Sequence, residues 1–514
     1  MALYLGFDSS TQGLKAVIID PNRGEIICAK TVNFGRDLPS YQCPGGFLEN
    51  PEPLVKHADP LLWLAALDLV LLRLKEDGAP LDQVAAIGGD AQQHGSVYLN
   101  AKFPGILAKL DPLLDLPTQL ASALSRATSP IWMDSSTGLE CAELSEAVGD
   151  RLQTSTGSPA IERFTGPQIR KFARTEPDAY SRTTRIHLVS SFLCSVLIGA
   201  DAPIDSGDGA GMNLLNLGTM EWDEAIAEAT APGLLARLPR IAATPVVSGG
   251  LASYFVKYGL AAGIPVATWT GDNPASLVGL GAVSHDTAVV SLGTSDTFFA
   301  SINPYRVDPD RFGHVFGLPS SGFMCLICFK NGSLARDRVR AEACVDWAFF
   351  GGDAFKKTEP GNQQRWALPW FEPEITPWVP QAGLRANFDF ASASAEVQIR
   401  AIVEAQVLSL RQYSQWIGDF KTIRVTGGGS QSMGILQTLA DVFNATVETI
   451  FTTDSAALGS AMIAAHTAGN ISYQTLAAAF SPATQTILPR PHAVQIYKES
   501  LVAFQKFETS AQSR

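Results

Sequence analysis

Positive charge is scarce in this sequence of 514 residues. It contains 38 lysines and arginines against 50 aspartates and glutamates, so its formal net charge is −12. No run of lysine and arginine is longer than a pair, whereas proteins that bind nucleic acids usually carry a basic stripe or patch. The sequence therefore argues against nucleic acid and favours a small molecule as the partner. An anionic ligand would need backbone N–H groups or a metal ion to overcome the overall charge.

Long apolar runs and regularly spaced cysteines are also missing. The longest apolar stretch, residues 186–200, includes His187, Ser190 and Ser191 and is too short to span a bilayer. The first residues lack the basic start of a signal peptide. The seven cysteines suggest no disulfide framework, and the one C-x-x-C pair, Cys325 and Cys328, lacks the second pair of a zinc site. We therefore expect no membrane association and a location in the reducing cytoplasm.

Three familiar nucleotide-binding signatures are absent or incomplete. There is no G-x-x-x-x-G-K-[ST] loop, and the H-R-D and D-F-G motifs are missing, which argues against a Walker-type NTPase and a protein kinase. Gly279-Leu-Gly281 lacks the third glycine of the dinucleotide-binding fingerprint, so a nicotinamide-dependent dehydrogenase is disfavoured. A nucleotide site in this chain must be built from other elements.

The order of predicted elements repeats once along the chain. Each half begins with a strand, a polar turn containing glycine, two further strands and a helix. These elements are residues 3–7, 8–13, 14–19, 25–32 and 61–74 in the first half, and 288–292, 293–296, 297–302, 323–329 and 335–350 in the second. A duplicated α/β unit predicts two domains, which we place at residues 1–281 and 282–514. The stretch 351–386, rich in proline and tryptophan, is too long for an ordinary connection and is interpreted as a functional or lid-like insertion.

Small polar turns at the strand ends are candidate phosphate and metal sites. Asp8-Ser-Ser-Thr-Gln-Gly13 offers a carboxylate for Mg²⁺ and N–H groups for phosphate, although alone it also suits an ordinary Asx turn. Ser291-Leu-Gly-Thr-Ser-Asp296 repeats the arrangement in the second half, and two facing hairpins could grip a polyphosphate. Gly427-Gly-Gly-Ser430 lies between a predicted strand and a predicted helix, where a flat ring or a phosphate can approach the backbone closely.

Two further segments carry side chains suited to a reaction centre. Gly271-Asp-Asn273 follows an apolar strand, so Asp272 is placed to act as a general base in a cleft. The same pattern suits a helix N-cap, and spacing alone does not separate the two interpretations. Gln92-Gln-His-Gly95 has polar side chains that can bind hydroxyl groups, although a lone histidine is usually structural. No two histidines have the spacing of zinc ligands.

Taken together, these motifs resemble those of the FGGY carbohydrate kinases of the actin-like ATPase superfamily. The likeness covers essentially the whole chain and points to the eukaryotic-type subgroup that acts on D-xylulose. The segments that carry it are 7–12, 37–39, 45–46, 89–95, 132–137, 163–166, 271–273, 291–295, 331–333, 374–377 and 427–428. Residues 92–94 are the most informative about the substrate.

The resemblance implies two ribonuclease-H-like domains, with a sugar and ATP meeting in the cleft between them and phosphate passing to the 5-hydroxyl of D-xylulose. It implies that Asp272 is the catalytic base and that Asp8 organises Mg²⁺ and phosphate. The implied sugar-binding residues are Gln93, His94, Arg163, Asp272 and Asn273. The implied ATP-binding residues are Asp8, Thr11, Gln12, Lys15, Gly293, Thr294, Trp347, Gly427, Gly428 and Ser432. Ser432 departs from the family pattern, since related sequences often have asparagine there.

Two alternatives to this function stay open. One is a kinase for another ketose or a polyol, such as L-xylulose, D-ribulose or a sugar alcohol. The other is a non-catalytic actin-like protein that binds a nucleotide, which would have no need of His94 or Asp272. The partners expected on the main hypothesis are the sugar and ATP, and a homodimer is the assembly to be tested.

Overall fold

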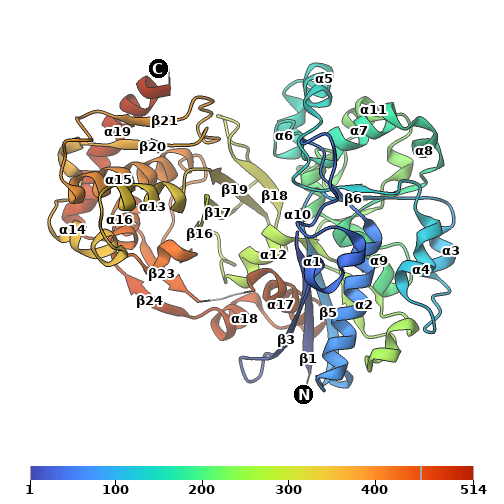
Figure 1. Ribbon diagram of the computed structural model, residues 1–514. Helices are drawn as coiled ribbons and strands as arrows, with labels where there is room; N and C mark the ends of the chain where they lie inside the picture. Colours follow the sequence, from blue (N-terminus) through green and yellow to red (C-terminus); the bar gives the residue numbers. More distant parts are fainter. Residues whose placement is uncertain (1, 452–453, 513–514) are drawn as a thin grey trace.

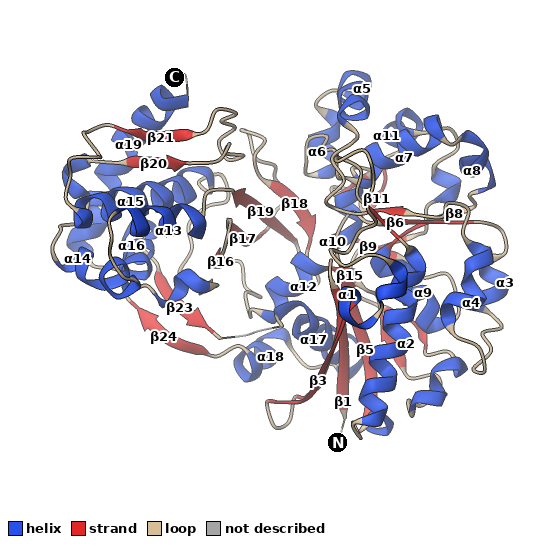
Figure 2. Cartoon of the chain, viewed as in Figure 1, coloured by secondary structure: helices blue, strands red, loops and turns tan. Residues whose placement is uncertain are grey.

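The computed structural model describes residues 2–451 and 454–512. The chain forms two lobes, each built on a seven-stranded mixed sheet with helices packed against it (Figure 1, Figure 2). In Figure 1 the first lobe lies on the right and the second on the left, and α12 (Asp272–Gly279) and α17 (Ser455–Gly469) lie between them. None of the helices in the described part of the chain has both the length and the apolarity required to cross a membrane.

The sheet of the first lobe begins with an antiparallel meander and continues with parallel strands. Its order is β13-β14-β5-β1-β2-β3, with β15 also paired to β5. The strand β1 is antiparallel to β2 and parallel to β5, which is in turn parallel to β14. These strands are β1 (Leu3–Ser9), β2 (Gly13–Asp20), β3 (Glu25–Asn33), β5 (Val84–Ala91), β13 (Val247–Gly250), β14 (Pro265–Ala267) and β15 (Thr270–Gly271).

The sheet of the second lobe repeats this order. The strand β16 is antiparallel to β17 and parallel to β22, which is parallel to β23, and β19 extends the antiparallel side. The strands are β16 (Thr287–Leu292), β17 (Asp296–Ile302), β18 (His314–Gly317), β19 (Phe323–Phe329), β22 (Thr422–Thr426), β23 (Thr446–Ile450) and β24 (Ala483–Ile487). The predicted duplication is therefore confirmed, and both sheets have the strand order of a ribonuclease-H-like domain.

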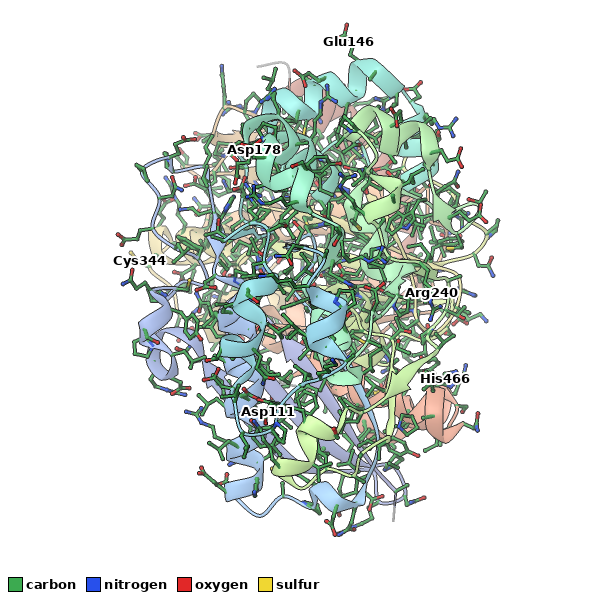
Figure 3. The ribbon with its side chains drawn as sticks, turned by 90° about the vertical axis from the view of Figure 1, so that its right-hand side faces the viewer. Asp111, Glu146, Asp178, Arg240, Cys344 and His466 are labelled. Carbon is green, nitrogen blue, oxygen red and sulfur yellow. The ribbon has the colours of Figure 1, made fainter. Side chains whose placement is uncertain are left out.

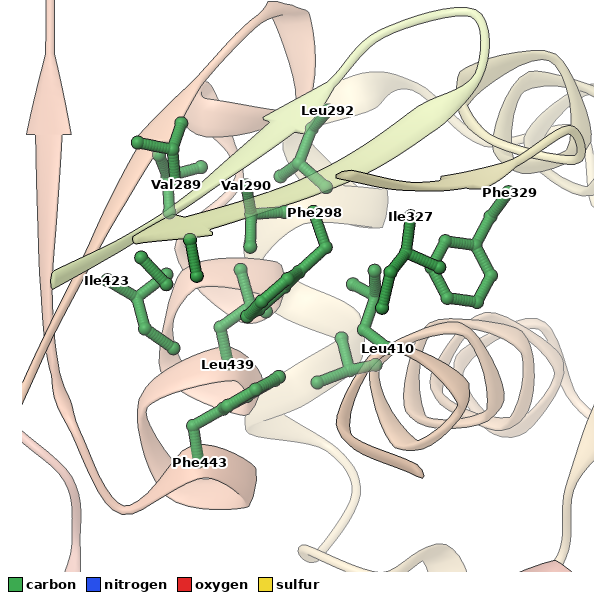
Figure 4. Packing of buried hydrophobic residues seen from close by; sticks show 14 of the residues in the cluster. Val289, Val290, Leu292, Phe298, Ile327, Phe329, Leu410, Ile423, Leu439 and Phe443 are labelled. Carbon is green, nitrogen blue, oxygen red and sulfur yellow. The ribbon is translucent and has the colours of Figure 1, made fainter. Parts of the chain in front are cut away.

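The core of the second lobe forms where apolar residues of the central strands meet two helices. Val290 and Phe298 lie on the paired strands β16 and β17, and Leu410 and Leu439 lie on α15 (Ala395–Tyr413) and α16 (Met433–Phe443) (Figure 4). The central strands are apolar on both faces, because helices or other chain segments cover both, as is usual for strands with parallel partners. This core fixes the strand ends that carry the polar turns.

One helix of the second half packs on the sheet of the first. A side chain at Gly6 of β1 would place its Cβ 2.2 Å from the backbone oxygen of Ala457, and one at Gly88 of β5 would come equally close to that of Ser460. Glycine is required at both strand positions because α17 lies directly against them. The predicted domain boundary at residues 281/282 falls between α12 and β16, and the division of the chain into two domains there stays a prediction.

The remaining helices cover the sheets and build the outer part of each lobe. In the first lobe they are α1 (Phe34–Asp37), α2 (Pro60–Glu76), α3 (Phe103–Leu107), α4 (Leu116–Leu120), α5 (Gly138–Val148), α6 (Arg151–Thr156), α7 (Thr165–Thr175), α8 (Pro177–Arg182), α9 (Val189–Ile198), α10 (Ser206–Gly209) and α11 (Glu224–Thr230). From the second half come α13 (Ser333–Glu342), α14 (Ala354–Lys356), α18 (Tyr473–Phe480) and α19 (Pro491–Gln512).

Short strand pairs complete the fold. They are β4 (His57–Ala58) with β7 (Ser129–Pro130), β6 (Ser96–Leu99) with β8 (Arg185–Leu188), β9 (Ile204–Asp205) with β12 (Ile241–Ala242), β10 (Leu215–Asn216) with β11 (Glu221–Trp222), and β20 (Ala367–Trp370) with β21 (Gly383–Ala386). The charged side chains Glu146 and Asp178 are exposed on the outer helices of the first lobe (Figure 3).

Two predictions about the second half need correction. The predicted helix 335–350 ends at Glu342, because Cys344 has a left-handed φ of 53°, and a separate π-helical turn follows at 349–353. The stretch 351–386 is not a lid. Its strands β20 and β21 pair with each other, and Trp366 and Trp370 are buried in a cluster that includes residues of α15 and α19.

Candidate active site

A cavity of about 240 Å³ lies where the two halves of the chain meet. It brings together four predicted site residues, Asp8, Lys15, Asp272 and Asn273. The other lining residues are Ser10 and Ser276 from the first half and Asp454, Ser455 and Ala456 from the start of α17. No local pattern predicts the contribution from α17, because that helix reaches the cavity through its packing on the first sheet.

Asp8 and Asp90 lie side by side at the ends of neighbouring parallel strands. The register of β1 and β5 places them opposite each other, and the Oδ2 of Asp90 accepts a 2.6 Å hydrogen bond from the Ser460 hydroxyl. The Oδ1 atoms of both aspartates are buried and accept no hydrogen bond from an N–H or hydroxyl donor among the described residues, and the two carboxyl groups are close enough to bond to each other when one is protonated. Burial raises the pKa of both carboxyl groups. The charge of Lys15 opposes the rise at Asp8, and the charge of Asp8 adds to it at Asp90.

Asp90 is a residue whose place sequence reasoning missed. It belongs to the motif 89–95, but no role was assigned to it, because a strand end followed by polar residues reads locally as a turn. The signal that could have found it is the parallel pairing of two strands that each end in aspartate.

Lys15 provides a positive charge at the cavity. It pairs with Asp8 in the β1–β2 register, and its Nζ lies 2.8 Å from the Oδ1 of Asp454. Because the cavity also contains Asp8 and Asp272, this lysine is surrounded mainly by carboxylates. An anionic group that entered the cavity would find one cation and would need further positive charge.

Asp272 is the first residue of α12 and follows the short strand β15. Its Oδ1 accepts hydrogen bonds from the backbone N–H of Asn273, at 2.8 Å, and from the Nδ2 of the same residue, at 3.0 Å. Burial, followed by the charge of Asp8, raises the pKa of Asp272 to about 7. The N-cap interpretation does not fit, because Gly271 occupies the N-cap position and Asp272 is already the first residue of the helix.

Gln93 connects the cavity to the predicted sugar-binding residues. Its Oε1 accepts a 2.9 Å hydrogen bond from the Nδ2 of Asn273, and its Nε2 donates to the backbone oxygen of Gly207 at 3.2 Å. A side chain at Gly271 would collide with Gln93, so the backbone of β15 is held directly against this glutamine. Gln93, Asp272 and Asn273 therefore form one connected group.

His94 is buried and held in one orientation. Its Nδ1 lies 2.9 Å from the backbone oxygen of Gly211, and its ring stacks on Phe164 with 4.2 Å between centroids. A carbonyl oxygen can only accept, so Nδ1 carries the proton and Nε2 presents a lone pair. Burial, together with the charge of Arg163, lowers the pKa of His94 well below its usual value, and the ring is neutral.

The far side of Phe164 is covered by the second lobe. His314, on β18, lies 5.6 Å from the Phe164 ring, and its Nδ1 is 3.1 Å from the Ser158 hydroxyl. Burial and the charge of Arg163 lower the pKa of His314 to about 3. Sequence analysis did not identify this histidine, because it lies more than 200 positions from His94 and no local pattern links the two.

A second cavity, of about 530 Å³, lies within the second lobe. It brings together the predicted residues Trp347, Gly428 and Ser432, and its other lining residues are Ser333, Arg336, Ala348, Gly429, Gln431 and Ile435. The indole of Trp347 is half exposed, so its ring is available to a planar ligand. Ser432 is the N-cap of α16, and a 3₁₀ turn at residues 428–431, which includes two of the three glycines, precedes that helix.

Five predicted ATP-binding residues line neither cavity. The hydroxyl of Thr11 accepts a 2.7 Å hydrogen bond from the indole N–H of Trp132. The others are Gln12, Gly293, Thr294 and Gly427, in or beside the turns. The second turn also differs from the first at its acid, because Asp296 is buried and forms two hydrogen bonds with Arg336. Its carboxylate is therefore not open to a metal ion.

Comparison with known proteins agrees with this architecture. The model of the N-terminal domain of the FGGY family of carbohydrate kinases matches residues 121–279, and that of the C-terminal domain matches residues 288–468. The crystal structure of xylulose kinase from Rhodospirillum rubrum superposes with a TM-score of 0.83 over all of both chains at 18% identity. That of Plasmodium falciparum glycerol kinase with ADP superposes with a TM-score of 0.79 at 14% identity, over 100% of this chain and 98% of that one.

Sequence relatives extend over nearly the whole chain. A xylulose kinase of Rattus norvegicus is 40% identical over 98% of this chain and 96% of its own length, and xylulose kinase 2 of Arabidopsis thaliana is 38% identical over 90% and 87%. The fold and the site thus define a two-domain α/β protein of the actin-like ATPase class. Within that class, the chain belongs to the FGGY family of carbohydrate kinases.

Proposed function

We propose that this carbohydrate kinase transfers the terminal phosphoryl group of ATP to the 5-hydroxyl of D-xylulose. The observation that carries the proposal is the shared cavity of Asp272 and Asp8, in which a carboxyl group with a pKa of about 7 lies beside a second carboxylate and Lys15. A general base works best when its pKa is near the operating pH. The choice of D-xylulose is supported by the identity of 38–40% to proteins named xylulose kinases.

On the sugar side, the proposal gives each residue a defined task. Asp272 takes the proton of the attacking hydroxyl. The Nε2 of His94 accepts a hydrogen bond from a sugar hydroxyl, because its Nδ1 proton is already donated to Gly211. The Nδ2 of Asn273 donates to Asp272 and Gln93, which leaves its carbonyl oxygen for the substrate. Arg163, close enough to affect the pKa of His94, adds a donor to the same region.

On the nucleotide side, we place the adenine in the cavity beside Trp347 and Gly428, and the phosphates toward the hairpins that contain Thr11, Gln12, Gly293 and Thr294. Asp8 fits Mg²⁺, because its Oδ1 is a buried carboxylate oxygen that accepts no hydrogen bond from an N–H or hydroxyl donor among the described residues. No group of three or more His, Cys, Asp or Glu side chains in the described chain could hold a metal ion, so phosphate oxygens would complete the coordination. A bound Mg²⁺ would neutralise charge on the transferring phosphoryl group.

The experiment is a coupled assay of ADP production over a panel of pentuloses, hexuloses and polyols. We expect D-xylulose to give the highest kcat/KM. A higher value for L-xylulose, D-ribulose or a sugar alcohol would move the proposal to that substrate, and no stimulation by any sugar would favour a non-catalytic nucleotide-binding protein. Cytoplasmic location and a homodimer stay predictions, and light scattering during gel filtration tests the dimer.

A further inference from the structure

The segment 351–386 places the carboxylate of Glu374 against residues 330 and 331, in the loop that contacts the hairpin between β16 and β17. Glu374 is only 3% exposed, and each of its oxygens accepts two hydrogen bonds. The Oε1 accepts from the backbone N–H of Lys330, at 2.6 Å, and of Ile375, at 2.8 Å. The Oε2 accepts from the backbone N–H of Asn331, at 3.1 Å, and from its Nδ2, at 2.9 Å. Four donors on two oxygens are what an ionised carboxylate can satisfy.

Asn331 is in turn held from two further directions. Its Oδ1 accepts a 2.9 Å hydrogen bond from the backbone N–H of Glu372, and its Nδ2 also donates to the backbone oxygen of Glu372 at 3.0 Å. The Nε2 of Gln406, on α15, donates to the backbone oxygens of Asn331, at 2.7 Å, and Gly332, at 3.3 Å. Residues 330–333 are thus fixed between the inserted segment and the long helix.

The same loop supports the hairpin between β16 and β17. Ser333 donates from its backbone N–H to the oxygen of Gly293 at 2.8 Å. A side chain at Gly332 would place its Cβ 2.7 Å from the oxygen of Thr294 and 2.8 Å from the nitrogen of Asp296, so the loop touches the hairpin directly. Arg336, one turn further along α13, binds Asp296 and also the Oε1 of Gln406. A shift of this loop would therefore move the turn that contains Gly293 and Thr294.

We propose that Glu374 is a positioning residue for the phosphate-binding hairpin of the second lobe. It sets the backbone of residues 330–333, and through it the turn at residues 293–295, in the position that receives the nucleotide phosphates. This inference rests on the proposed binding of ATP. It also gives the inserted segment a role, since the segment holds the rear of the site in place.

The test compares E374Q with E372Q. In either orientation, the NH₂ group of a glutamine at 374 would face two N–H donors, so the variant loses two acceptor positions and gains a donor clash. Glu372 lies two residues away, and its side chain is exposed, so its glutamine variant keeps every backbone contact. We expect E374Q to raise the Kd for ADP with Mg²⁺ at least tenfold, and the KM for ATP in parallel, because a small displacement at a phosphate site has a large effect. The Kd for D-xylulose should stay within twofold of the wild type, and E372Q should match the wild type in both titrations.

Each outcome of the titrations decides one question. An ADP affinity of E374Q within threefold of the wild type would overturn the positioning role, and an equal loss of sugar and ADP affinity would overturn it in favour of a general structural role. A wild-type protein that binds no ADP would instead overturn the proposed function, and this appears before any variant is examined. If E374Q does not fold, Q406M decides by the same criteria, because it removes the donor that binds Asn331 and Gly332 but keeps the length of the side chain.

Discussion

The two lobes share one strand order, but the buried acids of their corresponding hairpins have different partners. In the first lobe, Asp8 and Asp90 each keep an oxygen that accepts no hydrogen bond from an N–H or hydroxyl donor among the described residues. In the second lobe, Asp296 occupies the corresponding hairpin, and both of its oxygens bind Arg336. Asp441 likewise pairs with Arg490, and Glu508 accepts from Ser409, Gln412 and Tyr413.

This difference distinguishes buried acids that are open to a ligand from buried acids that are already bound by the protein. A carboxylate buried without a partner is unfavourable by several kcal/mol, and such groups occur mainly where a ligand or a proton completes them. A carboxylate bound by arginine is already satisfied and acts on its neighbours as a fixed anchor. On the proposed function, the acids of the first hairpin would serve the substrate and a metal ion, whereas Asp296 holds the second hairpin in shape.

The largest expected effect is that of D272N. Asparagine keeps the size and one acceptor oxygen but cannot take a proton, and loss of a general base typically lowers the rate by about 10²–10⁴. We expect kcat to fall by that factor, while Tm and the Kd values of sugar and nucleotide stay near those of the wild type. D310N, at an exposed aspartate of the second lobe, is the control. An asparagine variant that retained more than a tenth of kcat would exclude Asp272 as the base.

The next prediction compares the replacement of each hairpin acid, Asp8 or Asp296, by asparagine. D8N removes a carboxylate that forms no ion-pair hydrogen bond like that of Asp296 with Arg336, and should leave Tm nearly unchanged. The KM for ATP should rise by about 10- to 100-fold, the effect of one charge-assisted contact. D296N should do the opposite, since breaking a buried ion pair is unfavourable by about 3–5 kcal/mol and lowers Tm clearly. Thermal unfolding and steady-state kinetics of both variants provide the measurement. If the two variants were equally destabilised, the contrast between the lobes would be wrong.

His94 tests the sugar side of the first lobe. Truncation in H94A leaves a buried sugar hydroxyl without its acceptor, which is unfavourable by about 1–3 kcal/mol, or roughly 5- to 150-fold in affinity. The effect should appear in the KM for D-xylulose and spare the KM for ATP. H285A, at an exposed histidine of the second lobe that binds Ser301, serves as the control. Unchanged sugar kinetics in H94A would make His94 a structural residue.

Local patterns sufficed for the sheets but not for the contacts between distant elements. The strands β1, β2, β16, β17 and β19 were predictable because each is a short apolar run bounded by turn residues. The helix predicted at residues 335–350 failed because the apolar residues Val345, Trp347 and Phe350 continue the pattern past Cys344, where the backbone turns left-handed. Nothing local marks that change.

The residues of the candidate site that belong to local motifs were predictable, and those placed by long-range contacts were not. Asp8 and Asp272 stand at strand ends with recognisable motifs, and the cavity brings them together. Asp90 and Asp454 depend on strand register and on the packing of α17, and the four hydrogen bonds of Glu374 depend on the return of the segment 351–386. These are long-range contacts, which a single sequence does not reveal.

The smallest expected effect concerns Glu508, which accepts hydrogen bonds from neutral donors and forms no ion pair with the described residues. Burial raises the pKa of this carboxyl group to about 7, against about 4.3 in an unfolded chain. Between these two values the folded protein holds a proton that the unfolded chain has released, so stability falls as the pH rises from about 4.3 to 7 and changes no further above that range. Linkage puts an upper bound of about 3.7 kcal/mol on this loss.

E508Q resembles the protonated acid and should remove that dependence. The glutamine oxygen can accept from Tyr413 and Gln412, while its NH₂ group donates to the Ser409 hydroxyl, which is also an acceptor. We therefore expect the Tm of E508Q to equal that of the wild type near pH 5 and to exceed it by a few degrees near pH 8. E499Q, at an exposed glutamate on the same helix, should show the wild-type difference between the two pH values. If E508Q kept the wild-type difference, Glu508 would be ionised in the folded protein at pH 5, and hydrogen bonds from neutral donors would satisfy a buried carboxylate as well as arginine does at Asp296.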